Sequence, residues 1–201
     1  MRILITGFEP FADDACNPSM QVLSLLPEEI SGIKIITCVL PVVRFEAAEK
    51  VIAAIEKENP DAVISLGLAA GRRGITLERT AVNIDSYRIA DNKGNRPADE
   101  PVDRDGPCAY FSSLPIRKME AAILSAGYPA SVSESAGTFV CNHVFYSVRR
   151  WCELNMPRVI SGFIHLPCSD EMAAEGQFSM SLNDMEKAIE AAVSVFSQRD
   201  A

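Results

Sequence analysis

Residues 45–67 read FEAAEKVIAAIEKENPDAVISLG, and this stretch holds the two patterns that decide the fold class. Apolar residues recur at the spacing of one helix face, which predicts an amphipathic helix over residues 45–58. These residues are Ala48, Val51, Ile52 and Ile55. Pro60 ends the helical pattern, and the apolar run at 62–66 predicts a buried strand that stops at Gly67. A helix that leads directly into a buried strand is typical of an α/β fold.

The same alternation of strand and helix patterns extends from this stretch toward both ends of the chain. Strands are expected at 2–6, 34–40, 75–79, 130–133 and 158–166, and helices at 18–26, 116–125, 142–154 and 184–196. We therefore expect a single domain over residues 1–201 with an α/β fold and a mainly parallel sheet. The polar segment at 85–106 predicts a long surface excursion near a site.

The composition of the chain argues against several classes of function. Of its 201 residues, 48% are hydrophobic, and the formal net charge is −8 without a dense Lys/Arg cluster. This charge argues against nucleic acid or an anionic membrane as a partner. We find no apolar run long enough to cross a bilayer and no signal peptide. The six cysteines form no CxxC pair, so we expect a cytoplasmic protein with reduced thiols.

The segment 135–146, SAGTFVCNHVFY, places a cysteine where a helix is expected to begin. Unpaired N–H groups and a partial positive charge at a helix N-terminus favour a thiolate, so Cys141 is a candidate nucleophile near neutral pH. The alternative interpretation is a small buried core residue, a common role for cysteine. Cys168 is a rival nucleophile, but it follows Pro167 in an expected irregular turn with no helix start.

A cysteine nucleophile needs a base, and the sequence contains two histidines. His143 lies two residues after Cys141, and side chains at this spacing on a helix do not face each other. We expect His143 to pack or to form hydrogen bonds on the helix flank. His165 ends the predicted strand at 158–166 and is the better candidate base, with a hydrogen-bonded core histidine as the alternative.

Glu78 is the candidate acid for such a group, because it lies among apolar residues and offers an acceptor for the second nitrogen of a histidine. An ion pair with Arg79 or Arg88 explains the same residue equally well. Gly7, Gly67 and His165 all lie at predicted strand ends, where α/β sheets place their ligands, which indicates one shared site. The run GLAAGRRG at 67–74 lacks the Lys-Ser/Thr pair of a phosphate-binding loop and is interpreted as a tight turn.

Four motifs extend across nearly the whole chain. They are TGFEPF at 6–11 with Asn17-Pro18; GLA at 67–69 through ITLER at 75–79 and Asn83; SAG at 135–137 with Cys141-Asn142; and GFIHLP at 162–167. In combination they resemble the pyroglutamyl peptidase I family, also called pyrrolidone carboxyl peptidase, a family of cysteine peptidases. The resemblance implies removal of an N-terminal pyroglutamyl (5-oxoproline) residue from peptides. It also implies a three-layer α/β/α sandwich, a homotetramer, and no metal or cofactor.

The resemblance assigns a catalytic triad to Cys141, Glu78 and His165. It further implies substrate-binding roles for six residues, namely Phe8, Phe11, Asn17, Phe139, Val140 and Arg88. The sequence departs from the family pattern at Leu68, where many relatives carry glutamine, and at Cys168-Ser169-Asp170. We therefore expect the rim of the site to differ from that of many relatives.

These residues predict a thioacyl mechanism with a Cys141–His165 ion pair that Glu78 orients. N–H groups at the start of the Cys141 helix and in the turn at 67–74 are expected to stabilise the oxyanion. Two alternatives remain open. One is a non-catalytic α/β module that binds a small metabolite and uses the thiol as a redox sensor, and the other is a phosphorylase-like enzyme of similar architecture. Neither alternative requires the complete triad.

Overall fold

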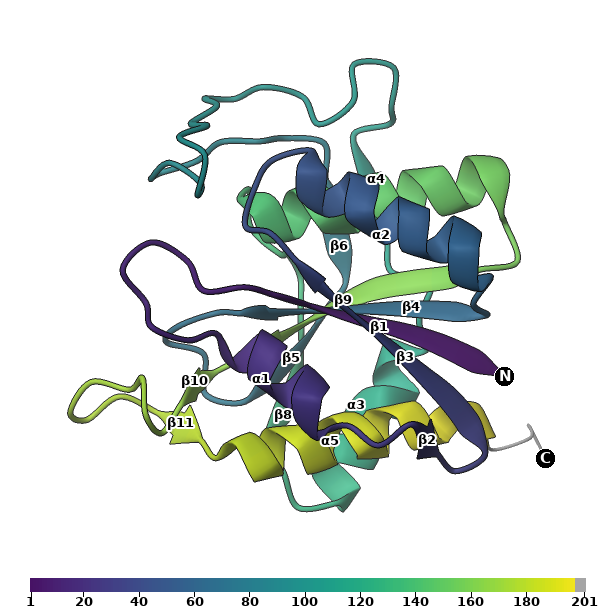
Figure 1. Cartoon of the computed structure of the whole chain (residues 1–201), viewed down its shortest axis with the longest axis vertical. Coiled ribbons are helices and arrows are strands. Elements are labelled where there is room, and N and C mark those ends of the chain that lie inside the picture. Colours follow the sequence, from purple (N-terminus) through teal and green to yellow (C-terminus); the bar gives the residue numbers. More distant parts are fainter. Residues whose placement is uncertain (198–201) are drawn as a thin grey trace.

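The computed structural model describes residues 1–197, and a seven-stranded sheet lies at its centre (Figure 1). The strands lie in the order β2-β3-β1-β4-β9-β5-β8. Neighbouring strands run parallel except where β2 pairs with β3 and β5 pairs with β9. The bounds are β1 Arg2–Phe8, β2 Glu29–Ile30, β3 Ile33–Leu40, β4 Ala62–Leu68, β5 Ile75–Glu78, β8 Ala130–Ser133 and β9 Ile160–Leu166.

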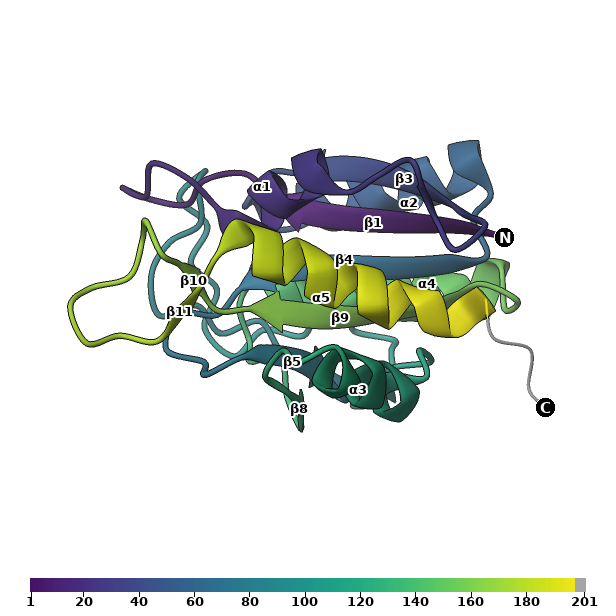
Figure 2. The ribbon, with the colours of Figure 1, turned by 90° about the horizontal axis from the view of Figure 1, so that it is seen from below.

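Helices cover both faces of this sheet and complete three layers (Figures 1 and 2). The helices α2 (Glu46–Glu58) and α4 (Val140–Asn155) pack on one face. The helices α1 (Pro18–Leu25), α3 (Ile116–Ser125) and α5 (Leu182–Ser194) pack on the other, and a 3-10 turn at Val195–Ser197 follows α5. The chain is thus a three-layer α/β/α sandwich, as expected.

The strands are apolar on both faces because both faces are covered. In β1, Ile3 and Ile5 contact the layer of α1, α3 and α5, whereas Leu4 and Phe8 contact the layer of α2 and α4. This follows from the alternation of side chains along a strand. A strand buried on both sides therefore appears in the sequence as a continuous apolar run, which is why β1 and β4 were predictable.

The predicted helices and long strands are confirmed, with ends that differ by up to two residues. Five short strands were not predicted, because strands of two or three residues carry no periodic pattern of their own. They are β2, β6 (Thr80–Val82), β7 (Ala109–Phe111), β10 (Cys168–Ser169) and β11 (Ser179–Met180). The last residues of the predicted single domain, 198–201, lie outside the described part of the chain.

The predicted surface excursion at 85–106 is confirmed, with an isolated bridge between Asp85 and Glu100 inside it. Asp91 organises this segment: its carboxylate accepts the backbone N–H groups of Arg44 at 2.7 Å and of Lys93 and Asn95 at 2.9 Å each. Burial alone would raise the pKa of Asp91, but these hydrogen bonds outweigh it and hold the pKa below its usual value of 3.8.

Asp91→Asn is expected to lower the free energy of unfolding at pH 7 by about 2 kcal/mol, since hydrogen bonds to a charged acceptor are lost. A carboxyl group with a depressed folded-state pKa stabilises the fold above its unfolded pKa, and this stabilisation disappears as the pH falls through the folded value. Urea unfolding at pH 7 and at pH 3 measures the effect. The two proteins should differ at pH 7 and converge toward pH 3, and a difference that is constant with pH would contradict this role for the carboxylate.

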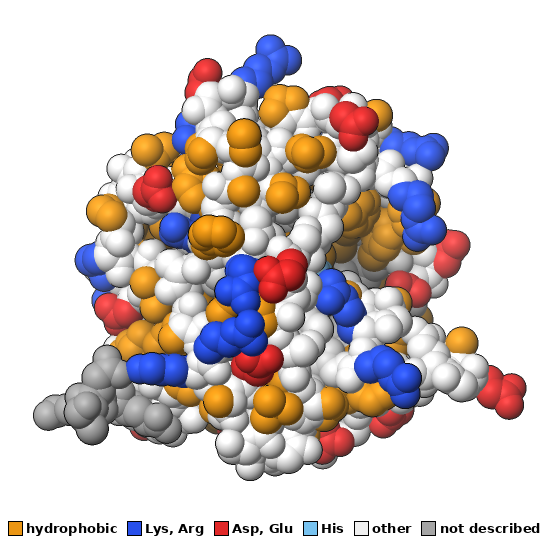
Figure 3. Space-filling model, turned by 180° about the vertical axis from the view of Figure 1, so that it is seen from behind, with side chains coloured by type: hydrophobic (Ala, Val, Ile, Leu, Met, Phe, Trp, Pro, Cys, Tyr) orange, Lys and Arg blue, Asp and Glu red, His pale blue; other side chains and the backbone are white. Residues whose placement is uncertain are grey.

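The surface of the molecule mixes both signs of charge. Figure 3 shows basic and acidic side chains beside each other across the middle of one face, with hydrophobic side chains gathered above them. Arg79 and Glu134 form one surface ion pair at 2.8 Å, and Arg117 and Glu120 form another at 2.9 Å. Within residues 1–197, no helix has the length and apolar content that a membrane crossing requires.

Candidate active site

Two strands carry candidate residues to the sheet face that α4 covers. In β9, Phe163 packs in the layer of α2 and α4, and His165, two residues further, lies on the same face. In β5, Ile75 and Leu77 point to the opposite layer, which places Glu78 on the α4 side. The alternation of side chains along paired strands therefore brings distant parts of the chain to one face.

His165 and Glu78 form a buried hydrogen bond. The Nδ1 atom of His165 lies 2.8 Å from Oε1 of Glu78, and the two side chains are 6% and 0% exposed. An ionised carboxylate can only accept, so Nδ1 carries the proton and Nε2 is the free acceptor of the ring. The hydroxyl of Thr76 also donates to Oε1 of Glu78, at 3.4 Å. This geometry favours an orienting role for Glu78, and its ion-pair partner is Arg72 rather than Arg79 or Arg88.

Cys141 lies beside the same strand ends. Phe139 is the N-cap of α4, so the helix begins two residues before the predicted start at 142, and Cys141 is its second residue rather than the residue before it. A Cβ atom built on Gly67 would lie 3.0 Å from the Sγ atom of Cys141, so the thiol packs directly on this glycine. Gly67 pairs in register with His165 on the neighbouring strand. The thiol and the imidazole therefore flank one backbone position.

The surroundings of Cys141 favour the thiol rather than the thiolate. Burial, and after it the charge of Glu78, raises the pKa of Cys141 from its usual 9.0 to about 12, although its own backbone N–H acts in the opposite direction. Loss of water therefore outweighs the favourable effect of the helix N-terminus on the thiolate. For the thiolate to form near neutral pH, the thiol would need a proton acceptor beside it.

Gly67→Ala is expected to lower kcat by about 100-fold, because the added methyl group displaces the thiol and a misplacement of about 1 Å has this scale of effect. Its Cβ would lie 3.0 Å from Sγ of Cys141 and 2.9 Å from the Phe163 ring. Gly71→Ala, in the turn that follows β4, is the control for backbone strain, since Gly71 has a φ of +89° that disfavours a side chain although a Cβ there meets nothing within 4 Å. Steady-state kinetics on both variants test this, and equal losses would point to the turn conformation instead of the thiol contact.

A cavity of about 570 Å³ opens over Cys141. Its walls include all six residues expected to bind substrate: Phe8, Phe11, Asn17, Phe139, Val140 and Arg88. The rings of Phe11 and Phe139 lie 5.2 Å apart, and that of Tyr87 lies 4.6 Å from Phe139. The cavity thus offers aromatic walls next to a thiol, a setting suited to a small neutral ring.

Asn17 shapes this cavity while its side-chain amide is already hydrogen-bonded. Its Oδ1 accepts the backbone N–H of Ser19 at 3.0 Å and so caps α1. Its Nδ2 donates to the carbonyl of Glu9 at 3.0 Å. Asn17 therefore holds the segment that carries Phe8 and Phe11 in place, and the contact it offers a ligand is mainly one of shape.

Comparison with known proteins places the chain in a family. A family model described as pyroglutamyl peptidase matches residues 1–199. The chain belongs to the pyroglutamyl peptidase family. It is 50% identical over 184 residues to the pyrrolidone-carboxylate peptidase of Vibrio parahaemolyticus, covering 90% of this chain and 86% of that protein. It is 46% identical over 197 residues to pyrrolidone-carboxylate peptidase 1 of Caldanaerobacter subterraneus, covering 97% of each.

Solved structures of the family share the fold. Pyroglutamyl peptidase I of Bacillus amyloliquefaciens superposes with a TM-score of 0.93 at 37% identity, covering 98% of this chain and 96% of that one. The E192A mutant of pyrrolidone carboxyl peptidase from Pyrococcus furiosus gives a TM-score of 0.92 at 37% identity, covering 97% of each chain. This member of the pyroglutamyl peptidase family is thus a hydrolase of the cysteine-peptidase type.

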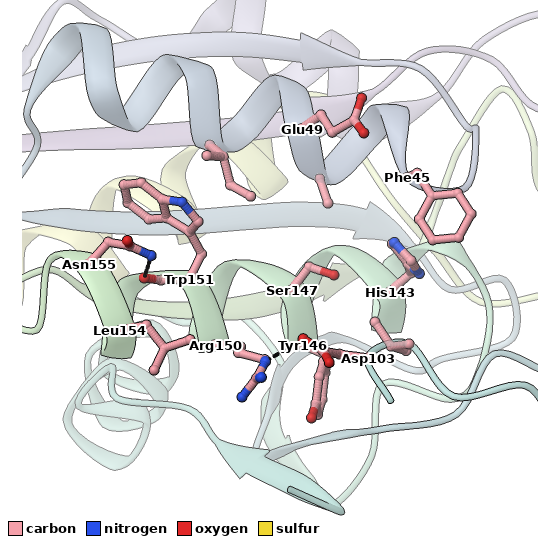
Figure 4. A pocket seen from close by; sticks show the side chains of 13 residues that line it. Phe45, Glu49, Asp103, His143, Tyr146, Ser147, Arg150, Trp151, Leu154 and Asn155 are labelled. Carbon is pink, nitrogen blue, oxygen red and sulfur yellow. Dashed lines mark hydrogen bonds and ion pairs between the residues drawn. The ribbon is translucent and has the colours of Figure 1, made fainter. Parts of the chain in front are cut away.

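His143, the second histidine of this pyroglutamyl peptidase family member, contacts other residues than His165 does. Nδ1 of His143 lies 2.7 Å from Oδ2 of Asp85, which also accepts from Nε of Arg44 at 2.8 Å. The ring of Phe45 lies edge-on to that of His143, with centroids 5.1 Å apart. Figure 4 shows both rings at one end of a cavity of about 260 Å³ between α2 and α4. This is the hydrogen-bonding role on the helix flank that we expected.

Cys168 lies in a short strand rather than in the irregular turn that we expected. It pairs with Ser179 in the two-stranded sheet of β10 and β11. The thiol is buried, and Nε2 of Gln177 donates to its Sγ at 3.2 Å. The side chain of Leu68, the other departure from the family pattern, lines the cavity over Cys141. Leu68 therefore adds an apolar contact where an amide side chain would offer a hydrogen bond.

Several residues at the site were missed from the sequence. Thr76 was discoverable, because it lies two residues before Glu78 on a strand and must share its face. Arg72 lies in the turn at 67–74, where no periodic pattern predicts direction, yet its Nη2 is 3.5 Å from Oε1 of Glu78. Among the described residues, no cluster of three or more His, Cys, Asp or Glu side chains is arranged to hold a metal ion.

Proposed function

We propose that this chain hydrolyses the bond after an N-terminal pyroglutamyl residue of peptides, with Cys141 as nucleophile, His165 as base and Glu78 as the acid that orients it. The observation that carries this proposal is the buried 2.8 Å hydrogen bond between His165 and Glu78, on the sheet face against which Cys141 packs. Family membership supports the substrate class.

The first half of the reaction forms a thioacyl-enzyme. Nε2 of His165 takes the proton of the Cys141 thiol while Sγ attacks the pyroglutamyl carbonyl carbon, and Glu78 stabilises the resulting imidazolium. Phe139 provides no side-chain cap to α4, so the first N–H groups of this helix are available to the oxyanion. The imidazolium then gives its proton to the leaving amine, the C–N bond breaks, and the shortened peptide departs.

The second half of the reaction consumes one water molecule. His165 removes a proton from the water as its oxygen attacks the thioester carbon. The C–S bond then breaks, the thiol of Cys141 recovers its proton, and free pyroglutamate leaves. Because nucleophile, base and acid all come from side chains, we expect EDTA to leave the rate unchanged.

The cavity supports selection of the lactam by shape. Pyroglutamate is a small neutral ring, and the aromatic rings of Phe11 and Phe139 offer apolar walls of matching chemistry. A prolyl residue brings a charged amine and lacks the ring carbonyl, and a glutamyl residue brings two charges. Either would lose hydration in this cavity, whose walls are uncharged apart from Asp14 and Arg88.

The deciding experiment compares fluorogenic reporters that begin with pyroglutamate, proline or glutamate, with and without prior treatment of the protein with iodoacetamide. We expect release only from the pyroglutamyl reporter and only without alkylation. Comparable kcat/KM values for the pyroglutamyl and prolyl reporters would refute the proposed specificity.

The family resemblance alone supports two further parts of this proposal, the oligomeric state and the cellular location. We propose a homotetramer that acts in the cytoplasm on pyroglutamyl peptides. Light scattering coupled to size-exclusion chromatography measures the mass directly, and a mass near that of one 21.9 kDa chain would contradict the tetramer.

A further inference from the structure

The carboxylate of Glu78 is buried and has few hydrogen-bond partners. Its side chain is 0% exposed, its Oε2 atom has no hydrogen-bond partner in the described structure, and its Oε1 atom accepts from two uncharged donors. These donors are the Thr76 hydroxyl at 3.4 Å and His165 Nδ1 at 2.8 Å, the latter being neutral until it takes a proton. A buried carboxylate with neutral partners is costly unless a cation lies close.

Arg72 is the cation nearest to this carboxylate within residues 1–197. Its Nη2 atom lies 3.5 Å from Oε1 of Glu78, and its side chain is 37% exposed. It belongs to the turn between β4 and β5, and both Ala70 in this turn and Leu68 at the end of β4 line the cavity over Cys141. The same turn therefore contacts both the substrate cavity and the buried acid.

We propose that Arg72 is a positioning residue that balances the charge of Glu78 while the thiol proton of Cys141 resides on His165. This inference rests on the triad of the proposed function. In that state the site contains a thiolate, an imidazolium and a carboxylate, with a net charge of −1. The guanidinium brings the sum to zero.

The other charged and titratable groups near the thiol do not supply this balance. From α4 and β9 come Cys141 and His165 themselves. From the segment after β6 come Tyr87, a buried phenol whose pKa is raised by burial and then by Asp85, and Arg88, which lines the cavity. Asp14, from the loop after β1, also lines the cavity, but its charge has the wrong sign to balance a carboxylate. Apart from His165 itself, Arg72 is the one cation among the described side chains that contacts Glu78.

Loss of a nearby cation shifts the pKa of every titratable group in the site in the same direction, upward. It favours the protonated form of each, so the Cys141 thiolate should form only at higher pH. The side chain of Arg72 is partly exposed, so solvent screens the effect. For Arg72→Gln we therefore expect the whole alkylation profile of Cys141 to shift upward by about 0.5–1 pH unit, which lowers the alkylation rate about 3- to 10-fold at each pH below the midpoint. At pH 7, kcat/KM should fall about 5- to 10-fold with KM nearly unchanged.

The test measures the rate of iodoacetamide reaction at Cys141 from pH 6 to pH 11, with mass spectrometry of the Cys141 peptide to separate it from the other cysteines. Arg73→Gln is the matched control, because Arg73 is exposed on the same turn and carries the same charge. Arg72→Lys should recover at least half of the wild-type kcat/KM. Circular dichroism checks that each variant is folded, which we expect because Arg72 is on an exposed turn.

Each outcome bears on the inference. Superimposable alkylation profiles for wild type, Arg72→Gln and Arg73→Gln would overturn it, as would an Arg72→Lys variant as impaired as Arg72→Gln. Alkylation does not depend on peptide hydrolysis, so the two proposals fail separately. A shifted profile in a protein that leaves pyroglutamyl reporters intact would refute the function and keep the role of Arg72. An unshifted profile in an active protein would do the reverse.

Discussion

Cys141→Ala is expected to abolish hydrolysis of pyroglutamyl reporters, with kcat falling by about 10⁶-fold, the scale observed when the nucleophile of a triad is removed. Alanine lacks the sulfur atom that forms the thioacyl bond. The alanine side chain is smaller than the thiol side chain that packs on Gly67, so it fits in the same place and the variant should keep its fold. Single-turnover and steady-state assays with an active-site titration measure the loss.

Cys168→Ser provides the matched control for this variant. The Cys168 thiol is buried and accepts a hydrogen bond from Gln177, and a serine hydroxyl of similar size can accept the same bond. Most of the activity should remain. Equal losses in the two variants, or turnover that survives in Cys141→Ala, would remove Cys141 from the proposed mechanism.

Glu78→Gln is expected to lower kcat by about 10⁴-fold, the scale seen when the acid of a triad is replaced by its amide. The amide cannot stabilise an imidazolium by charge, and its N–H group can hold His165 in the wrong tautomer with Nδ1 as acceptor. KM should change little, because Glu78 is not among the residues that line the substrate cavity.

Glu134→Gln is the control for loss of a negative charge as such. Glu134 is 75% exposed and pairs with Arg79 on the surface, so its replacement should leave kcat unchanged. The pH dependence of kcat for both variants and a circular dichroism spectrum complete the test. A Glu78→Gln enzyme with near-normal kcat would reduce Glu78 to an ion-pair partner of Arg72.

The layers of the fold were predictable because apolar runs and helical spacing are local signals. The run at 62–66 is buried on both faces, and the helix pattern at 45–58 matches α2 nearly end to end. The direction of β5 was not predictable, since its antiparallel pairing with β9 depends on register between residues far apart in the chain. The strand pattern alone is the same for either direction.

For the site, residue chemistry proposed Cys141 and His165 and left Glu78 open between a triad acid and an ion-pair partner, and the family resemblance then assigned Glu78 to the triad. The structure places Glu78 and His165 in contact. The state of the thiol could not be predicted, because its pKa depends on how much water the folded chain removes from it. The contact of Arg72 with Glu78 also escaped prediction, since the path of a glycine-containing turn follows from tertiary packing. Gly74, for example, has a φ of +149° and no room for a Cβ against Pro129.

The antiparallel strand β5 has a consequence for when activity appears. Glu78 and His165 are separated by 87 positions, and His165 acquires its partner only after β9 has entered the sheet and β5 has paired along its far edge. Contacts between such distant segments form slowly. A chain emerging from the ribosome therefore holds its thiol without a working base until most of the polypeptide has been made. During refolding, the return of peptide hydrolysis should lag behind the return of helical ellipticity, so that enzymatic turnover reports completion of the central sheet.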